Sequence, residues 1–281
     1  MNISTAPLLR YPGGKYRARK ILNNIVPDST KRVLSPFSGG ASVEMFLTKR
    51  GIQVDCYDGY DLLANFWEYV IGKPKELSSE IYKYFGNVDK KTFLNMQKNL
   101  KEHHNNILDE ERLLLAVLFF IVNRCSFSGT TLSGGFSQES SIKRFTQSSI
   151  SRIESFNNPL ITYNHGFYED VLSDKNTVEK YDLLLLDPPY LLKNKNNDGV
   201  SALYGVSGDM HKYFDHDNFK NVIDQYDIPF ILTYNNIDEV KEMWGEYNIY
   251  PAQWSYGMNN SKKSSEIIIT NFEIGGGYIG K

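Results

Sequence analysis

The run Leu183-Leu184-Leu185-Leu186-Asp187-Pro188-Pro189-Tyr190 decides the fold class. Four consecutive apolar residues are expected of a central strand that is buried on both faces of a parallel sheet. Both prolines fix φ and lack an N–H donor, so a rigid turn that leaves the strand is one interpretation of residues 187–190. Four specified residues at the end of a buried strand favour a functional site instead.

Strands and helices alternate on both sides of this run. Residues 32–35 form a predicted strand, 41–49 a predicted helix and 54–57 a second predicted strand, and a further helical pattern follows. Later apolar runs at 229–234 and 266–272 supply two more strands. This order and spacing indicate a parallel sheet with crossover helices, in which ligands bind beyond the carboxyl ends of the strands.

A glycine pair lies after the first strand, in Phe37-Ser38-Gly39-Gly40. Glycine permits positive φ and close approach of a ligand to the backbone, although a structural turn explains the pair equally well. Asp58 ends the next strand, about 20 residues further on, where a nucleoside ligand presents its ribose hydroxyls. Neither Gly-x-Gly-x-x-Gly nor the lysine of a P-loop is present. The pattern indicates a nucleoside cofactor that needs no pyrophosphate.

The residues that follow the central strand suit chemistry on an aromatic amine. Such an amine is a poor nucleophile, because its lone pair is delocalised into the ring. The Asp187 carboxylate and the Pro188 carbonyl can hold the two amino hydrogens and draw the nitrogen toward tetrahedral geometry. Tyr190 offers a face on which a base turned out of the double helix can stack. We therefore predict Asp187, Pro188 and Tyr190 as the catalytic group.

Near the N-terminus, Tyr11-Pro12-Gly13-Gly14-Lys15 precedes a basic amphipathic helix predicted over 15–25. Considered alone, the segment is most simply a Pro-Gly turn. Tyr11 and Lys15 also offer an aromatic surface and a cation for the carboxylate of a cofactor.

The middle of the chain has a different composition. After a strongly apolar helix predicted over 111–122, residues 124–151 are rich in Ser, Thr, Gly and Gln. They show no helical period, and their glycines are typical of hairpin turns. A solvated linker fits this composition, and so does an ordered recognition module, because three phenylalanines (127, 136 and 145) lie among basic residues.

Base readout needs donors and acceptors at groove edges, and backbone contacts need positive charge. The residues of 124–151 predicted to contact DNA are Arg124, Ser126, Ser128, Gln138, Lys143 and Arg144. The segment Lys193 to Asp217 is the alternative position for the reader.

Composition sets broad limits on function. The 281 residues, 41% hydrophobic and 23% charged, are typical of a soluble globular protein with one large domain and an inserted module. A net charge of −2 argues mildly against a protein that coats nucleic acid, but not against an enzyme with a local basic cleft. The absence of a signal-peptide core or of ~18 consecutive apolar residues predicts a cytoplasmic protein without membrane contact. Cys56 and Cys125 are expected to be buried thiols, and no metal site is expected.

Tyr-Pro-Gly-Gly-Lys, Pro-Phe-Ser-Gly-Gly and Asp-Pro-Pro-Tyr, in that order, resemble the motifs of the Dam-like (alpha group) N6-adenine DNA methyltransferases. Further similarities are Asn123-Arg124, Phe214-Asp215-His216 and residues 262–266. Two positions depart from the family pattern. The glycines at 39 and 40 are adjacent, and Gly166 precedes Phe167 where many relatives have an acidic residue.

The resemblance implies a Rossmann-like methyltransferase sheet formed by residues 1–85 and 152–281, with a target recognition domain inserted at 86–151. It implies transfer of a methyl group from S-adenosylmethionine to the N6 amine of a flipped adenine in double-stranded DNA. It also implies a monomer, with a cognate restriction endonuclease as a candidate partner; an orphan regulatory role or a phage origin stays open, as does the recognition sequence. The residues implied for cofactor binding are Tyr11, Lys15, Phe37, Gly39, Gly40, Asp58, Phe167 and Asp187.

Rival functions share parts of this pattern. N4-cytosine methyltransferases usually have serine in place of Asp187, and protein glutamine methyltransferases usually have asparagine there. RNA methylation is a more distant alternative. A catalytically silent DNA-binding module would have no use for an intact Asp187-Pro188-Pro189-Tyr190.

Overall fold

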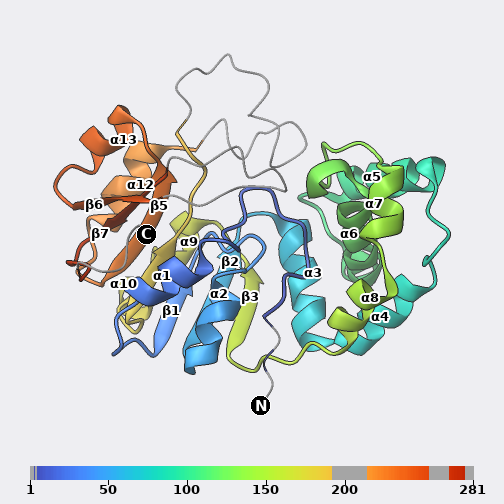
Figure 1. Cartoon of the computed structure of the whole chain (residues 1–281), viewed down its shortest axis with the longest axis horizontal. Helices are drawn as coiled ribbons and strands as arrows, with labels where there is room; N and C mark the ends of the chain where they lie inside the picture. The colour runs from blue at the N-terminus through green and yellow to red at the C-terminus, as the bar shows by residue number, and fades with distance from the viewer. Residues whose placement is uncertain (1–2, 4, 192–213, 253–265, 276–281) are drawn as a thin grey trace.

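The computed structural model describes residues 3, 5–191, 214–252 and 266–275. Within these residues, seven strands form one sheet in the order β3-β2-β1-β4-β5-β7-β6 (Figure 1). Neighbouring strands from β3 to β5 are parallel, whereas β7 is antiparallel to both β5 and β6. The strands are β1 (Arg32–Ser35), β2 (Gln53–Asp58), β3 (Ile161–His165), β4 (Leu183–Leu186), β5 (Phe230–Asn235), β6 (Asn248–Ala252) and β7 (Glu266–Thr270).

The strand order reverses between β1 and β4, which are neighbours in the sheet. From β1 the chain proceeds outward to β2 and β3, and from β4 it proceeds the other way to β5. At such a switch point a crevice opens at the carboxyl ends of the strands. Residues 36–40 leave β1 and residues 187–190 leave β4 at this crevice. The topology therefore brings together two motifs that are far apart in the sequence.

The residues of β4 alternate between two hydrophobic cores. Leu183 and Leu185 belong to the core that contains α1, α2 and α3, whereas Leu184 and Leu186 belong to the core that contains α9, α10, α12 and α13. All four are buried, which confirms the predicted central strand. The helices around the sheet are α1 (Arg19–Ile25), α2 (Glu44–Leu47), the 3-10 turn η1 (Thr48–Arg50), α3 (Asp61–Gly72), α9 (Tyr168–Val171), α10 (Lys175–Val178), α12 (His216–Ile223) and α13 (Asp238–Met243).

A second group of helices, α4 to α8, lies beyond α3 at the β3 edge of the sheet (Figure 1). Helix α3 joins the two parts, because it packs against both β3 and α6. Helix α4 packs against α6 and α8, so the group begins before residue 86 and ends after residue 151. Its elements are α4 (Pro74–Tyr82), α5 (Lys90–His103), η2 (Asp109–Glu111), α6 (Arg112–Cys125), η3 (Phe127–Gly129), α7 (Gln138–Lys143) and α8 (Gln147–Glu154).

The expectation that 124–151 lacks helices is wrong, because α7 and α8 lie there. Serine and threonine are weak inside helices but strong at N-caps. The Ser137 side chain accepts from the backbone N–H of Ser140, and Thr146 forms a capping box with Ser149. These caps initiate short helices whose polar composition conceals their period. The expected turn is found just before them, where Ser126 and Phe136 form an antiparallel bridge.

Other boundaries differ by a few residues. The helix predicted from residue 41 begins at Glu44, because Ala41 has a left-handed φ of 50°. The helix predicted from residue 15 begins at Arg19. No helix of the described ranges combines the length and apolarity that crossing a membrane requires.

Candidate active site

A cavity of about 780 Å³ lies at the carboxyl ends of β1, β2 and β4. This volume falls within the range of small-molecule binding sites. Every residue predicted to carry catalysis or to bind the cofactor lines the cavity. None of the residues predicted to contact DNA does. The structure therefore separates the two predicted sets.

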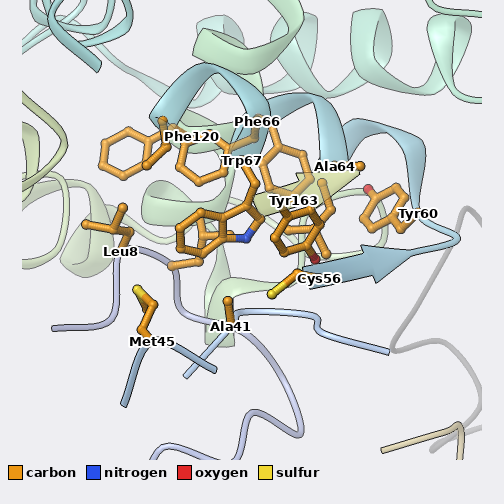
Figure 2. Packing of buried hydrophobic residues seen from close by; sticks show 14 of the residues in the cluster. Leu8, Ala41, Met45, Cys56, Tyr60, Ala64, Phe66, Trp67, Phe120 and Tyr163 are labelled. Carbon is orange, nitrogen blue, oxygen red and sulfur yellow. The ribbon is translucent and has the colours of Figure 1, made fainter. Parts of the chain in front are cut away.

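The peptide groups of Gly39 are fixed from both sides. Its N–H donates to Asp58 Oδ2 at 2.8 Å, and its carbonyl accepts from the Tyr163 hydroxyl at 2.8 Å and from Trp67 Nε1 at 3.2 Å. The rings of Trp67 and Tyr163 lie next to each other (Figure 2) and stack, with centroids 5.6 Å apart. The loop after β1 is thus held by β2, β3 and α3 before any ligand binds.

Tyr11 explains why two adjacent glycines occur in this loop. A Cβ on Gly39 would lie 2.7 Å from Tyr11 Cε1, and a Cβ on Gly40 would lie 2.9 Å from Tyr11 Cβ. Gly39 also has a φ of 49°, which disfavours other residues. The two glycines are therefore adjacent where Tyr11 of the N-terminal segment packs directly on the loop and leaves no room for a Cβ at either position.

Asp58 accepts from two backbone donors, Gly39 N at 2.8 Å and Tyr60 N at 3.0 Å. Desolvation by the surrounding protein raises its pKa to about 6, although these hydrogen bonds and the charge of His165 lower it. Each backbone donor uses one lone pair on a different carboxylate oxygen, so one lone pair remains on each. Asp58 can accept from two neighbouring hydroxyl groups.

The Asp187 carboxylate is held by two side chains. Lys15 Nζ lies 2.8 Å from both of its oxygens, and the Thr233 hydroxyl donates to Oδ1 at 2.6 Å. A carboxylate offers about four acceptor positions. Lys15 and Thr233 occupy three of them, which leaves one position on Oδ2 for a further donor.

Tyr190 is fixed at its hydroxyl and beside its ring. The hydroxyl donates to Glu266 Oε2 at 2.6 Å, and Lys15 Nζ lies 5.0 Å from the ring centroid. The next residue, Leu191, accepts from Asn235 Nδ2 at 2.8 Å. Strands β5 and β7 therefore orient the segment that leaves β4.

Two aromatic residues of the predicted cofactor set differ in exposure. Phe37 packs within 5.5 Å of both Tyr168 and Phe219, as ring centroids. Phe167 is 49% exposed at the edge of the cavity. A Cβ on the neighbouring Gly166 would lie 3.1 Å from Val171 Cγ2 and 3.2 Å from the Tyr57 ring. This close packing favours glycine at position 166, where many relatives have an acidic residue.

The sequence analysis gave no role to three polar residues near the catalytic segment: Glu44, Thr233 and Glu266. Thr233 could have been found as a buried polar residue within the apolar run of β5. Glu44 is an acidic residue in the first turn after the glycine pair. Glu266 begins β7 and ends the segment 262–266 that resembles the family, but only the tertiary structure brings it to the Tyr190 hydroxyl.

Two of the residues predicted to contact DNA lie in the protein interior. Arg124 is 6% exposed and its guanidinium donates to the Leu8 carbonyl, while Ser126 is fully buried and donates to the Asn123 carbonyl. Both residues lie at the C-terminal end of α6, where carbonyls lack helical partners. Their burial contradicts the prediction that they contact DNA.

The other four residues of that set are accessible. Ser128, Gln138 and Lys143 are exposed and Arg144 is half-buried, and Lys143 pairs with Glu139 at 2.9 Å. The residues 193–213 of the alternative reader segment, and the matching residues 262–265, lie outside the described part of the chain.

The loop 127–135 is held in place by side-chain hydrogen bonds at its base. The Asn123 side chain donates to the carbonyls of Arg10 and Gly129 at 3.0 and 2.7 Å, and the Thr131 hydroxyl lies 3.0 Å from that of Tyr60. Phe127 stands 71% exposed on this loop. The loop thus connects to the N-terminal segment and to a tyrosine of the cavity wall.

Comparison with known proteins gives a consistent result. A family model of the D12 class N6 adenine-specific DNA methyltransferases matches residues 11–258. A type II methyltransferase of Lactococcus lactis subsp. cremoris, M1.LlaDCHI, is 19% identical to this chain over an alignment of 288 positions, which covers 96% of each chain.

Proposed function

The chain belongs to the D12 class N6 adenine-specific DNA methyltransferases, and we propose that its cavity holds the cofactor and a flipped adenine while helices α4–α8 contact the DNA. The enzyme transfers a methyl group from S-adenosylmethionine to the N6 amine of adenine in DNA. One observation carries the assignment of the site. Asp187, held by Lys15 and Thr233, lies in the same cavity as Asp58 and the glycine pair.

The cavity suits a nucleoside that carries a charged amino-acid tail. Gly39 and Gly40 expose backbone to it, Asp58 offers acceptors for ribose hydroxyls, and the half-exposed ring of Phe167 offers a face for a base. We assign Tyr11 and Lys15 to the binding of the amino-acid tail of the cofactor. When bound, the cofactor supplies an electrophilic methyl group on a positively charged sulfur.

The residues after β4 act on the amine. The remaining acceptor position of Asp187 and the Pro188 carbonyl receive its two hydrogens, and the nitrogen lone pair then turns toward the methyl group. The Tyr190 ring provides the stacking surface for the extruded base, at a contribution of about 1–3 kcal/mol. Because the contacts of Lys15, Thr233 and Glu266 are already formed, the site needs little reorganisation.

The test is methyl incorporation from labelled cofactor into duplex DNA, with the modified nucleoside identified by mass spectrometry. We expect N6-methyladenine. Asp187→Ala should lower the rate by about 10²–10³, as is typical when one preorganised polar group is lost. Asp170→Ala, an exposed carboxylate on α9, is the matched control. N4-methylcytosine, or label in RNA or protein only, would contradict the assignment.

For DNA contact, we propose the exposed face of α4–α8, with Ser128, Gln138, Lys143 and Arg144 as its polar and cationic groups. Phe127 joins this set because a ring 71% exposed on an anchored loop is available to contact bases. Binding assays with duplexes of different sequence, before and after Phe127→Ala, test the surface. Unchanged affinity and unchanged target sites would exclude the loop.

The similarity to a type II methyltransferase supports a role in protecting DNA from a cognate endonuclease. We propose that the protein acts as a monomer in this role. Mapping of modified bases in expressing cells would give the target, and resistance of that DNA to the partner nuclease would test the role. Light scattering with bound DNA tests the oligomeric state.

A further inference from the structure

Glu44 is a buried carboxylate on the wall of the cavity. It begins α2 directly after the glycine loop, and it is 5% exposed. The Ser35 hydroxyl donates to its Oε1 at 2.9 Å. In the described part of the chain, no lysine, arginine or histidine forms an ion pair with it. A buried carboxylate without a counter-ion is costly, so its presence in a binding cavity points to a ligand.

The groups around Glu44 do not supply a positive charge. Burial, with a smaller contribution from Asp187, raises the pKa of Glu44 to about 7, although hydrogen bonds from Ser35 and from backbone N–H groups lower it. Cys56 and Tyr163 also face Glu44, and burial raises the pKa of both well above their usual values, so both stay neutral at pH 7. Lys15 also lines the cavity, and this cation is bound to Asp187.

We propose that Glu44 binds the α-ammonium group of S-adenosylmethionine, while Lys15 lies on the side of its α-carboxylate. The inference rests on the proposed function, in which this cavity holds the cofactor. The cofactor carries two cations, the ammonium and the sulfonium. Only the ammonium has N–H donors, and a carboxylate oriented by Ser35 is a directional acceptor for them. The contact thereby fixes the amino-acid tail beside the glycine loop.

A different role for Glu44 would be to accept the proton that the amine loses after methyl transfer. That role needs no contact with the cofactor. It predicts unchanged cofactor affinity and a changed pH dependence of the chemical step when the carboxylate is removed. Binding measurements without DNA therefore separate the two roles.

The experiment is calorimetric titration of wild type and Glu44→Gln with three ligands. S-adenosylmethionine has both cations, S-adenosylhomocysteine has only the ammonium, and methylthioadenosine has neither. We expect the variant to lose about 10- to 100-fold in affinity for the first two, the worth of a charged hydrogen bond, and nothing for the third. Glu154→Gln, on an exposed residue of α8, is the control.

Proton release gives an independent readout. A carboxyl group with a pKa of about 7 is half protonated at pH 7, and a bound cation lowers that pKa. Titration of S-adenosylhomocysteine in buffers of different ionisation enthalpy should show release of about half a proton that Glu44→Gln lacks. Thermal denaturation confirms that the variant is folded.

Three outcomes would contradict the proposal. Equal loss for all three ligands means that Glu44 supports the cavity rather than the tail. A loss confined to S-adenosylmethionine means that it faces the sulfonium, and no loss for any ligand removes it from the cofactor site. Each of these overturns the ammonium contact. Failure of wild type to bind any of the three would instead contradict the assignment of the cavity itself.

Discussion

The hydroxyl of Tyr190 donates a hydrogen bond of 2.6 Å to Oε2 of Glu266, the first residue of β7. Glu266 is buried, and β5 separates its strand from β4 in the sheet. The residue expected to serve only as a stacking surface is therefore also a hydrogen-bond donor. Loss of the hydroxyl would deprive a buried carboxylate of a donor, so the hydroxyl and the ring have separable functions.

Tyr190→Phe should lower stability by about 1–3 kcal/mol, the cost of a buried polar group left short of a partner. It should keep most of the methyl transfer rate per folded molecule, because the ring remains. Tyr190→Ala should lower both the stability and the rate of methyl transfer. Chemical denaturation and single-turnover kinetics measure the two effects. The double variant Tyr190→Phe, Glu266→Gln should recover part of the stability; equal loss of rate in the phenylalanine and alanine variants would contradict the stacking role.

Thr233 is a positioning residue for Asp187. Thr233→Val keeps the shape of the side chain but removes the hydroxyl that donates at 2.6 Å, so the carboxylate can rotate on Lys15. We expect kcat to fall about 10-fold or more with little change in cofactor affinity. Thr233→Ser restores the donor and should restore most of the rate. If serine fails where valine fails, packing of β5 rather than the hydrogen bond is responsible.

Five of the seven described strands were predictable from sequence because they are short apolar runs with clear ends, whereas β3 and β6 were not predicted because exposed or half-buried residues interrupt their buried ones. Leu183 to Leu186 is buried on both faces as expected, and all residues expected around the cofactor line one cavity. Most of these residues follow or end a strand, so the position of each strand determines the position of its residue; Tyr11 and Lys15 instead lie in the N-terminal segment before α1. Their roles in binding and catalysis remain predictions.

The helical group was less predictable because its key residues act through tertiary contacts. Arg124 was expected to contact DNA as a basic residue among polar ones, but it binds the Leu8 carbonyl in the interior. Nothing local distinguishes a buried arginine at a helix end from an exposed one. The caps Ser137 and Thr146 were visible in the sequence, but their short helices lack a readable period.

We expect the affinity of the cavity for a nucleoside to fall at acidic pH because Asp58 becomes protonated. Its pKa is raised to about 6, so the carboxylate becomes protonated as pH falls below that value, and one of its two acceptor oxygens becomes a donor. The affinity for methylthioadenosine, which lacks the charged tail, should fall by up to about 10-fold per pH unit below 6. Calorimetry across pH 4.5–8 tests this, within the range where the protein stays folded. Asp58→Asn should bind at least 10-fold more weakly at pH 8 and show a flat profile; a sloping profile would place the titrating group elsewhere.

Glu44 should lower stability as pH rises. Its pKa is raised in the folded protein from 4.5 to about 7, so the folded state binds more protons than the unfolded state between these values. Stability is therefore lost as pH increases from 4.5 to 7, by on the order of 3 kcal/mol for this group. Glu44→Gln should be more stable than wild type at pH 8 and similar to it at pH 5. Urea denaturation at both pH values measures the difference, and an equal difference at both would show that Glu44 does not titrate as its burial requires.

Lys143 and Arg144 should contribute to DNA binding without reading sequence, because backbone contacts require charge alone. Replacing both with glutamine should weaken binding to all duplexes and reduce the slope of log K against log salt by about 1 for each phosphate that is no longer neutralised. Glu139→Gln is an informative control, since it releases Lys143 from its pair at 2.9 Å and should strengthen binding slightly. By contrast, exchange of the loop 127–135 with that of a relative of different specificity should change the methylated site and leave cofactor affinity unaltered. An active graft with an unchanged target would place the reader outside this loop, and an unchanged salt slope in the double variant would place the phosphate contacts on another face of α4–α8.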